Sequence, residues 1–157
     1  MRLTMNDRIT VRVCVYSTSN PIYDFIEPSL AEVPHIGDTL SFYPFDGGNI
    51  EKGKVIGRDV YYINGNDRHH HISSVYLTVK FPVEKWLHLW NDWCNDNSRK
   101  SYDKMVRGSN KFLWNMSNKG DVAFLLRHTA AFGLDNKQKL LLEAFMNSKN
   151  PNEKYYE

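Results

Sequence analysis

The chain has 157 residues, is 41% hydrophobic and carries a formal net charge of +2, which suits one domain or two packed subdomains with a true core. Its longest uninterrupted apolar run, Val122–Leu126, is far shorter than the ~20 residues of a membrane-spanning helix, and its first residues lack the apolar region of a secretory signal. The two cysteines, Cys14 and Cys94, stand far apart, so the sequence excludes a paired-cysteine metal motif and favours a cytoplasmic protein with buried, reduced thiols.

The first predicted element is a strand over residues 9–16, because apolar and mostly polar residues alternate there. The connection that follows is some twenty residues long, and connections of that length without regular structure are often functional. It either packs its aromatic residues onto the sheet or recognises a partner, and it could also supply a short fifth strand. The residues that would contact a partner protein are Tyr23, Phe25, Glu27 and Glu32.

Three further strands are predicted, near residues 39–45, 53–63 and 72–81. A turn at Asp46-Gly47-Gly48 separates the first two, and Asn64-Gly65-Asn66-Asp67 is a strong reversal signal before the third. Four strands with tight turns after one long connection are typical of a small antiparallel β-barrel, which we place at residues 7–81.

Short motifs in this region resemble known small barrels. The segment Ile22-Tyr23-Asp24-Phe25, followed by Gly37-Asp38 and Leu40-Ser41-Phe42, resembles the opening of an SH3-type barrel. Gly37-Asp38 with Gly53-Lys54-Val55 also resembles KOW-type barrels, which often sit on RNA or on the transcription and translation machinery. The resemblance covers residues 9–80 and implies an SH3-like fold. It does not imply a proline-peptide groove, because the tryptophan pair and the Pro-x-x-Tyr element of signalling SH3 domains are missing.

Pro82 marks the change from strands to helices, which makes the protein α+β. We predict a bundle of three to four helices at residues 82–149, packed on the barrel, and a frayed tail at residues 150–157. The first helix covers residues 83–95, and an isologous homodimer through its tryptophans is one alternative. Its inward side is predicted to hold Val83, Trp86, Leu87, Leu89, Trp90, Trp93 and Cys94.

The second helix is predicted over residues 101–117, although Gly108 could split it in two. For the third helix, over residues 121–132, Asp121 is the predicted cap and Gly133 the end. For the last helix, Asp135 and Gln138 form a predicted capping box.

The second helix carries the main functional signal. Basic residues recur along one of its sides, and like charges at this spacing repel unless an anionic partner offsets them. Lysine and arginine neutralise phosphates, so the pattern indicates contact with nucleic acid or a nucleoprotein, although a solvated charged face gives the same pattern. The predicted contact residues are Lys100, Lys104, Arg107 and Lys111, with Arg99 and Lys119 flanking them.

Signals for catalysis are weaker. The sequence has no phosphate-binding glycine loop, no nucleophile elbow and no zinc-type spacing of cysteine and histidine. The run of three histidines at 69–71 could place His69 and His71 on one face of a strand as metal ligands, but two ligands do not make a site. No cofactor is predicted.

We therefore expect a binding protein rather than an enzyme. The first hypothesis is a nucleic-acid binder that uses the basic helix. The alternative is an inhibitor or adaptor of a host or partner protein, of the kind that small phage or mobile-element proteins often are, which would use the 17–35 loop and the barrel face. A metal-dependent hydrolase that uses the histidine run is the third.

Overall fold

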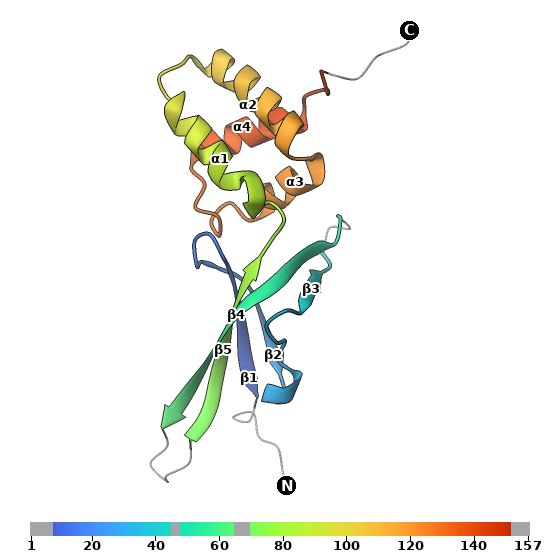
Figure 1. The fold of residues 1–157 in the computed structure, drawn as a ribbon, viewed down its shortest axis with the longest axis vertical. Helices are drawn as coiled ribbons and strands as arrows, with labels where there is room; N and C mark the ends of the chain where they lie inside the picture. The colour runs from blue at the N-terminus through green and yellow to red at the C-terminus, as the bar shows by residue number, and fades with distance from the viewer. Residues whose placement is uncertain (1–7, 45–47, 65–69, 152–157) are drawn as a thin grey trace. The chain divides into compact units, whose positions relative to one another are not determined.

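The computed structural model describes residues 8–44, 48–64 and 70–151 (Figure 1). The chain divides at Phe81 and Pro82 into two compact units, an N-terminal sheet and a C-terminal group of helices. The α+β organisation predicted from the sequence is therefore confirmed at this level. Within the described ranges no helix is both long and apolar enough to cross a bilayer.

Five strands form a single sheet in the order β2-β1-β5-β4-β3. The strands are β1 (Ile9–Val15), β2 (Pro21–Glu27), β3 (Thr39–Phe42), β4 (Glu51–Asn64) and β5 (His70–Lys80). Three pairings are antiparallel, but β1 and β5 are parallel. The sheet is therefore mixed, and the prediction of a purely antiparallel barrel is wrong for this central pair.

The parallel pair follows from the path of the chain. After the β1–β2 hairpin, the chain passes through the short 3₁₀ helix η2 (Leu30–Glu32) to the opposite edge of the sheet and enters β3. The β3–β4 and β4–β5 pairings then reverse the chain direction twice, which brings β5 alongside β1 with the same direction. Because β2 arises within the predicted long connection, the expectation of a fifth strand there is confirmed.

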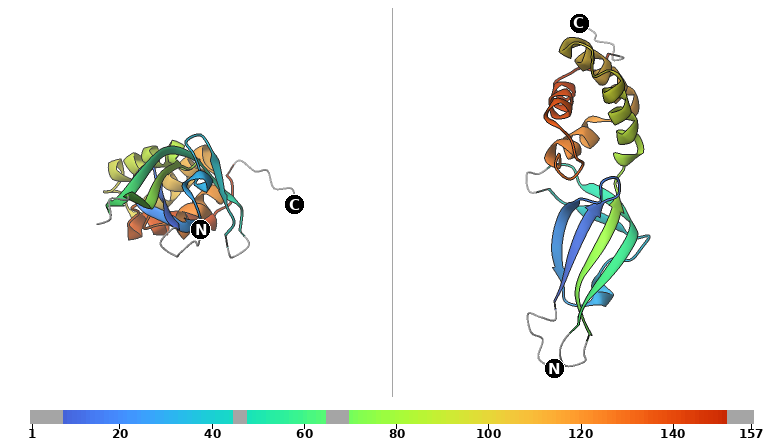
Figure 2. Two further views of the ribbon diagram at one scale, coloured as in Figure 1. Left: turned by 90° about the horizontal axis from the view of Figure 1, so that it is seen from below. Right: turned by 90° about the vertical axis from the view of Figure 1, so that its left-hand side faces the viewer.

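The sheet curls into a half-barrel, as Figures 1 and 2 show. Its two long strands, β4 and β5, contain register shifts near Ile56 and Ser73, and such bulges increase local twist and bend a sheet. The concave side holds the core of this unit, which confirms the predicted alternation. Its buried residues include Ile9, Val11, Val13, Val15, Val55, Val75, Leu77 and Val79.

Side chains join the two edge strands of the half-barrel. The rings of Tyr23 on β2 and Phe42 on β3 are stacked, with centroids 4.1 Å apart and planes 16° apart. The hydroxyl of Tyr23 also donates a hydrogen bond to Glu51, a carboxylate that is only 6% exposed. The open side of the half-barrel is thus spanned by an aromatic pair and a buried polar contact rather than by a ladder of backbone hydrogen bonds.

Four helices make up the second unit: α1 (Glu84–Asp96), α2 (Tyr102–Met116), α3 (Lys119–Arg127) and α4 (Asn136–Met146). Within this unit α2 contacts both α1 and α4, and α3 contacts α4. The number of helices agrees with the prediction, and α2 continues without a break through Gly108. The core side chains include Trp86, Leu87, Trp90, Met105, Leu113, Val122, Leu125, Leu141, Leu142 and Phe145.

The first helix is built largely as its pattern predicts. Trp86 and Trp90 are 4% and 0% exposed, so they are core residues, and the indole nitrogen of Trp90 donates to Ser109 Oγ on α2 at 3.0 Å. Leu89 was expected on the same side but is 42% exposed. The predicted apolar side was wider than the buried one, which within α1 holds Glu84, Trp86, Leu87, Trp90 and Cys94.

The ends of the last two helices differ in how well the sequence predicts them. The capping box of Asp135 and Gln138 is present, as expected. The predicted cap of α3 is wrong: Asn118 caps the helix by accepting from the backbone nitrogen of Asp121 at 2.8 Å. The carboxylate of Asp121 instead accepts a hydrogen bond from the indole nitrogen of Trp86. The helix ends at Arg127, and turns lead from there to Gly133.

Candidate anion-binding face of α2

The predicted basic residues lie on the exposed side of α2. Lys100 lies just before this helix, and Lys104, Arg107 and Lys111 follow along it; all four are exposed. Arg99 is exposed next to Lys100. The opposite side of α2 holds Met105, Ser109 and Leu113, which are buried, so the helix separates its cations cleanly from its core residues.

No described carboxylate neutralises these cations. The ion pair between Arg12 and Asp24 belongs to the sheet and involves none of these cations. Lys104, Arg107 and Lys111 are spaced one helical turn apart, and like charges at that spacing repel by a few tenths of a kcal/mol per pair. We name the set of Lys100, Lys104, Arg107 and Lys111 the basic row.

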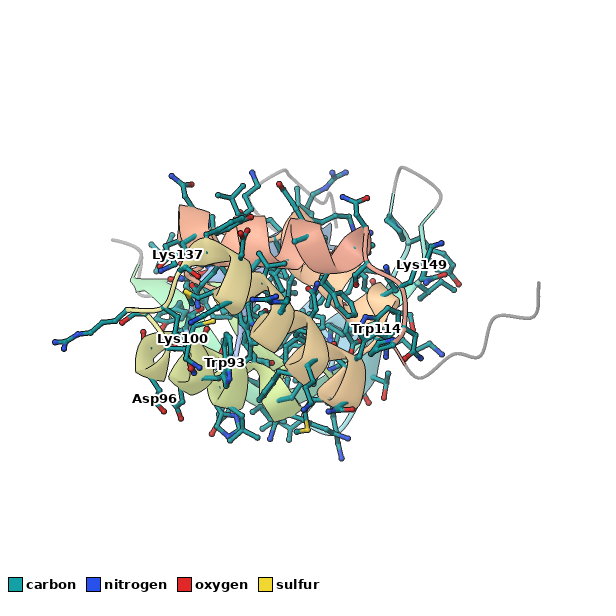
Figure 3. All side chains as sticks on the ribbon, turned by 90° about the horizontal axis from the view of Figure 1, so that it is seen from above. Trp93, Asp96, Lys100, Trp114, Lys137 and Lys149 are labelled. Carbon is teal, nitrogen blue, oxygen red and sulfur yellow. The ribbon has the colours of Figure 1, made fainter. Side chains whose placement is uncertain are left out.

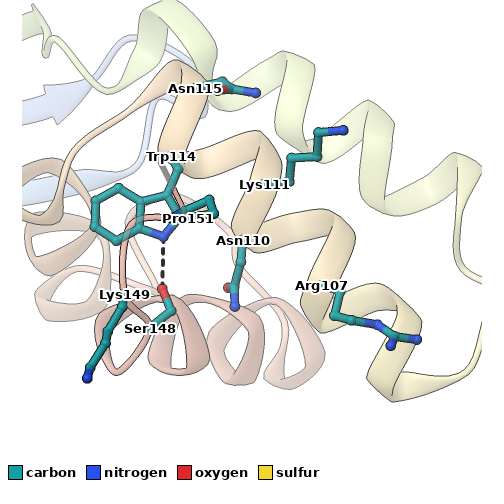
Figure 4. A pocket seen from close by; sticks show the side chains of 8 residues that line it. All are labelled: Arg107, Asn110, Lys111, Trp114, Asn115, Ser148, Lys149 and Pro151. Carbon is teal, nitrogen blue, oxygen red and sulfur yellow. Dashed lines mark hydrogen bonds between the residues drawn. The ribbon is translucent and has the colours of Figure 1, made fainter. Parts of the chain in front are cut away.

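A cavity of about 360 Å³ opens at the C-terminal half of α2, where the chain leaves α4 (Figure 4). Two members of the basic row, Arg107 and Lys111, line it, and Lys149 adds a third cation. No carboxylate of the described residues lines the cavity. Among the residues that the structure describes, the lining consists of Arg107, Asn110, Lys111, Trp114, Asn115, Ser148, Lys149 and Pro151. The cavity therefore combines positive charge, two amide side chains and an apolar wall.

The apolar wall is held in place by hydrogen bonds and packing. The indole nitrogen of Trp114 donates to Ser148 Oγ at 3.0 Å, as Figure 4 shows, and that hydroxyl donates in turn to the carbonyl of Phe145 at 2.7 Å. The Trp114 ring also packs against the ring of Phe145, with centroids 4.8 Å apart. Figure 3 shows Trp114 near Lys149 and far along α2 from Lys100.

Asn110 stands out among the polar residues of the cavity. Figure 4 shows its side chain pointing from α2 toward the α4 side. Its Oδ1 atom is buried and accepts no hydrogen bond from any residue that the structure describes. A buried acceptor without a donor costs about 1–3 kcal/mol, so native structures contain few of them. This side chain is therefore poorly explained by packing alone.

Lys119, which the sequence places beside the basic row, has a different position. Its ammonium group donates to three carbonyl oxygens, those of Phe145 at 2.9 Å, Met146 at 2.6 Å and Ser148 at 2.9 Å. It also lies 5.2 Å from the centroid of the Trp114 ring. The last turn of α4 has no basic residue of its own, so Lys119 supplies the cation that stabilises the negative end of this helix.

The residues of the alternative protein-binding surface lie on two elements. Tyr23, Phe25 and Glu27 alternate along β2, and Glu32 is exposed in η2. Tyr23 is engaged with Phe42 and Glu51, and Phe25 is half-buried. The most exposed apolar residue of β2 is instead Ile26, at 58%.

The histidine run does not yield a site in the described structure. His69 lies outside the described residues, and for His71 only the backbone, on β5, is described. Among the residues whose side chains are described, no three His, Cys, Asp or Glu gather closely enough to hold a metal ion.

Sequence reasoning missed the cavity, Asn110 and the role of Lys119. Asn110 and Asn115 are polar residues between cations, and no periodic pattern marks them as different from a solvated face. The cavity depends on the path of residues 148–151 after α4, which is an irregular segment. Comparisons of the chain with protein-family models, with curated protein sequences and with solved structures find no match.

Proposed function

We propose that the protein binds nucleic acid, without catalysis, through the exposed face of α2. The observation that carries this proposal is the basic row. Within the described residues its four cations have no carboxylate partner, and two of them line a cavity with no acidic residue among its described lining. Phosphate neutralisation by lysine and arginine supplies most of the sequence-independent affinity for nucleic acid.

The resemblance of residues 9–80 to KOW-type barrels points to the same class of partner. We propose with it that the curled sheet is related to SH3-like barrels. Arg99 extends the basic row at its N-terminal end. We leave Lys119 out of the contact surface, because three carbonyl oxygens hold its ammonium group.

Phosphate contacts make a specific prediction about salt. If the four cations of the basic row each neutralise one phosphate, a fourfold rise in salt should weaken binding about 50-fold for single strands and about 150-fold for duplex DNA, because bound counterions are released on association. A complex held by apolar contact would change far less.

The test is binding of the pure protein to labelled single- and double-stranded DNA and RNA, measured by fluorescence anisotropy at low and at physiological salt. The variant replaces all four residues of the basic row with Glu. The control variant replaces four other exposed cations of the same unit with Glu, and so changes the net charge equally. These cations are Lys85, Arg127, Lys137 and Lys139.

We expect the first variant to lose binding and the control to keep most of it. Equal losses in both variants would reduce the effect to net charge. No binding of the wild-type protein at low salt would overturn the proposal.

A second candidate is the binding of a partner protein at β2. This strand is at an edge of the sheet and presents Ile26 to solvent, and an exposed edge can accept a strand from another chain. Such a complex should survive high salt. Ile26→Lys should weaken it while leaving oligonucleotide binding unchanged, and a complex that dissolves at high salt would count against this role.

A further inference from the structure

We propose that the cavity between α2 and residues 148–151 holds one nucleotide of a single-stranded nucleic acid. The cations at its rim would contact the phosphate, the Trp114 side would contact the base, and the amides of Asn110 and Asn115 would face the polar edge of the base. This inference rests on the proposed function and adds to it a preference for single strands, because a duplex does not offer its bases to a cavity of this kind.

The size and charge of the cavity fit such an occupant. Its volume of about 360 Å³ lies at the lower end of the range for small-molecule sites, which is ~300–1,000 Å³. Arg107, Lys111 and Lys149 line it, and no carboxylate does within the described part of the chain, so an anion is favoured. A guanidinium group presents parallel N–H donors that match the oxygens of a phosphate.

The apolar wall gives the base a surface. Trp114 is half-buried, lines the cavity together with Pro151, and is fixed by Ser148 and Phe145. A fixed ring loses little conformational freedom when a base packs on it, and contact between bases and aromatic side chains is tolerant of sequence. The remaining cations of the basic row, Lys104 and Lys100, continue away from the cavity along α2. They would follow the phosphates of the neighbouring nucleotides.

The amide of Asn110 supports a ligand with hydrogen-bond donors. Its Oδ1 is closed to solvent in the structure, so the amide would turn toward the cavity to accept from such a ligand. Its buried Oδ1 has no donor among the described residues, and the residue lines the cavity. The amino groups and ring N–H groups of nucleobases are donors that an asparagine can accept. An unpaired Oδ1 on Asn110 lowers the stability of the folded protein. A role in binding would explain why this residue is present there.

The first test is an NMR titration that uses the indole N–H signals of the four tryptophans. We expect a 5′-mononucleotide to shift the signal of Trp114 and to leave that of Trp90, which is buried and bonded to Ser109, unchanged. Ribose 5-phosphate and inorganic phosphate are titrated in parallel. If either shifts Trp114 as much as the mononucleotide does at equal concentration, the base makes no contact and the inference is overturned.

The second test uses variants. Asn110→Leu keeps the approximate size of the side chain and removes the unpaired acceptor, so it should raise the midpoint of urea unfolding and weaken single-strand binding about tenfold. Asn115→Glu places a carboxylate at the cavity and should weaken single-strand binding at least as much. The control, Lys100→Glu with Lys104→Glu, should weaken oligonucleotide binding but leave the mononucleotide titration unchanged.

These outcomes separate the inference from the proposed function. If oligonucleotides bind through the basic row but Asn110→Leu and Asn115→Glu have no larger effect on single strands than on duplexes, the cavity holds no base. If no oligonucleotide binds at low salt, the proposed function fails together with the inference.

Discussion

The ring of Trp93 on α1 lies directly over Gly108 on α2. A Cβ atom on residue 108 would be 2.4 Å from Cζ2 of Trp93, a separation that real Cβ atoms do not adopt. The missing side chain of Gly108 therefore leaves the space that the Trp93 ring occupies. This contact explains why a residue that weakens an isolated helix occurs in the middle of α2.

Replacing Gly108 with Ala should destabilise the protein. Alanine favours a helix by ~1 kcal/mol over glycine, but the displaced Trp93 ring would cost about 1–3 kcal/mol, so we expect a net loss of stability in urea unfolding. In a Trp93→Ala background the clash is absent, and the same change should instead stabilise the protein. A Gly108→Ala variant that is stabilised in both backgrounds would show that the ring moves aside without cost.

Removing the ammonium group of Lys119 should weaken the end of α4. Lys119→Met keeps much of the packing but leaves three carbonyl oxygens without their cation, and we expect a loss of about 1–3 kcal/mol in the free energy of unfolding. The matched control is Lys137→Met, whose ammonium makes one exposed contact to the carbonyl of Ser98, and it should change stability by less than about 0.5 kcal/mol. An equal effect of both variants would remove the special role of Lys119.

Two interactions of Tyr23 span the open side of the half-barrel, and two variants separate them. Tyr23→Phe keeps the ring and removes the hydroxyl that donates to Glu51, and it should cost about 1–2 kcal/mol, because that carboxylate is buried. Tyr23→Ala also removes the stack on Phe42 and should cost about 2–4 kcal/mol. Urea unfolding measures both, and equal losses for the two variants would mean that the stack contributes nothing.

The thiol of Cys94 should be unreactive in the folded protein. Burial, followed by the charge of Asp135, raises the pKa of Cys94 to about 12, and its side chain is only 7% exposed. Burial also raises the pKa of Cys14. In a Cys14→Ser variant at about pH 8, labelling by a thiol reagent should therefore be at least ~100-fold slower in the native state than in urea.

The same shift affects stability in alkaline solution. Between the ordinary thiol pKa and about 12 the unfolded state releases this proton and the folded state retains it, so the contribution of Cys94 to stability falls as pH rises. For the labelling experiment described above, rapid reaction of Cys94 in the native protein at neutral pH would contradict the burial of its thiol.

Local patterns predicted local structure well. The alternation of Ile9, Val11, Val13 and Val15 reports burial on one face of a strand, and the Asp135–Gln138 capping box depends on residues three positions apart. The same holds for the basic row, because helical periodicity alone places its residues on one side. Each of these features is decided by neighbours in the sequence.

Features that depend on distant segments were not predicted. The pairing of β1 with β5 depends on where the chain goes after β2, and several paths satisfy the same alternation. Lys119 resembles the other cations in sequence, and only the position of the end of α4 distinguishes it. The cavity likewise requires α2 and residues 148–151 to lie together.

The parallel pairing of β1 and β5 also has a consequence for how the protein is made. The central strands of the sheet are the first and the last of their unit in sequence, so β1 cannot gain its second hydrogen-bonding neighbour until residue 80 has left the ribosome. Until then β1 has no partner strand along one of its edges, whereas α1 with α2 and α3 with α4 pair as neighbours along the chain. Contacts between distant residues form slowly, so we expect the sheet to set the folding rate and nascent chains that stop before β5 to need protection from aggregation.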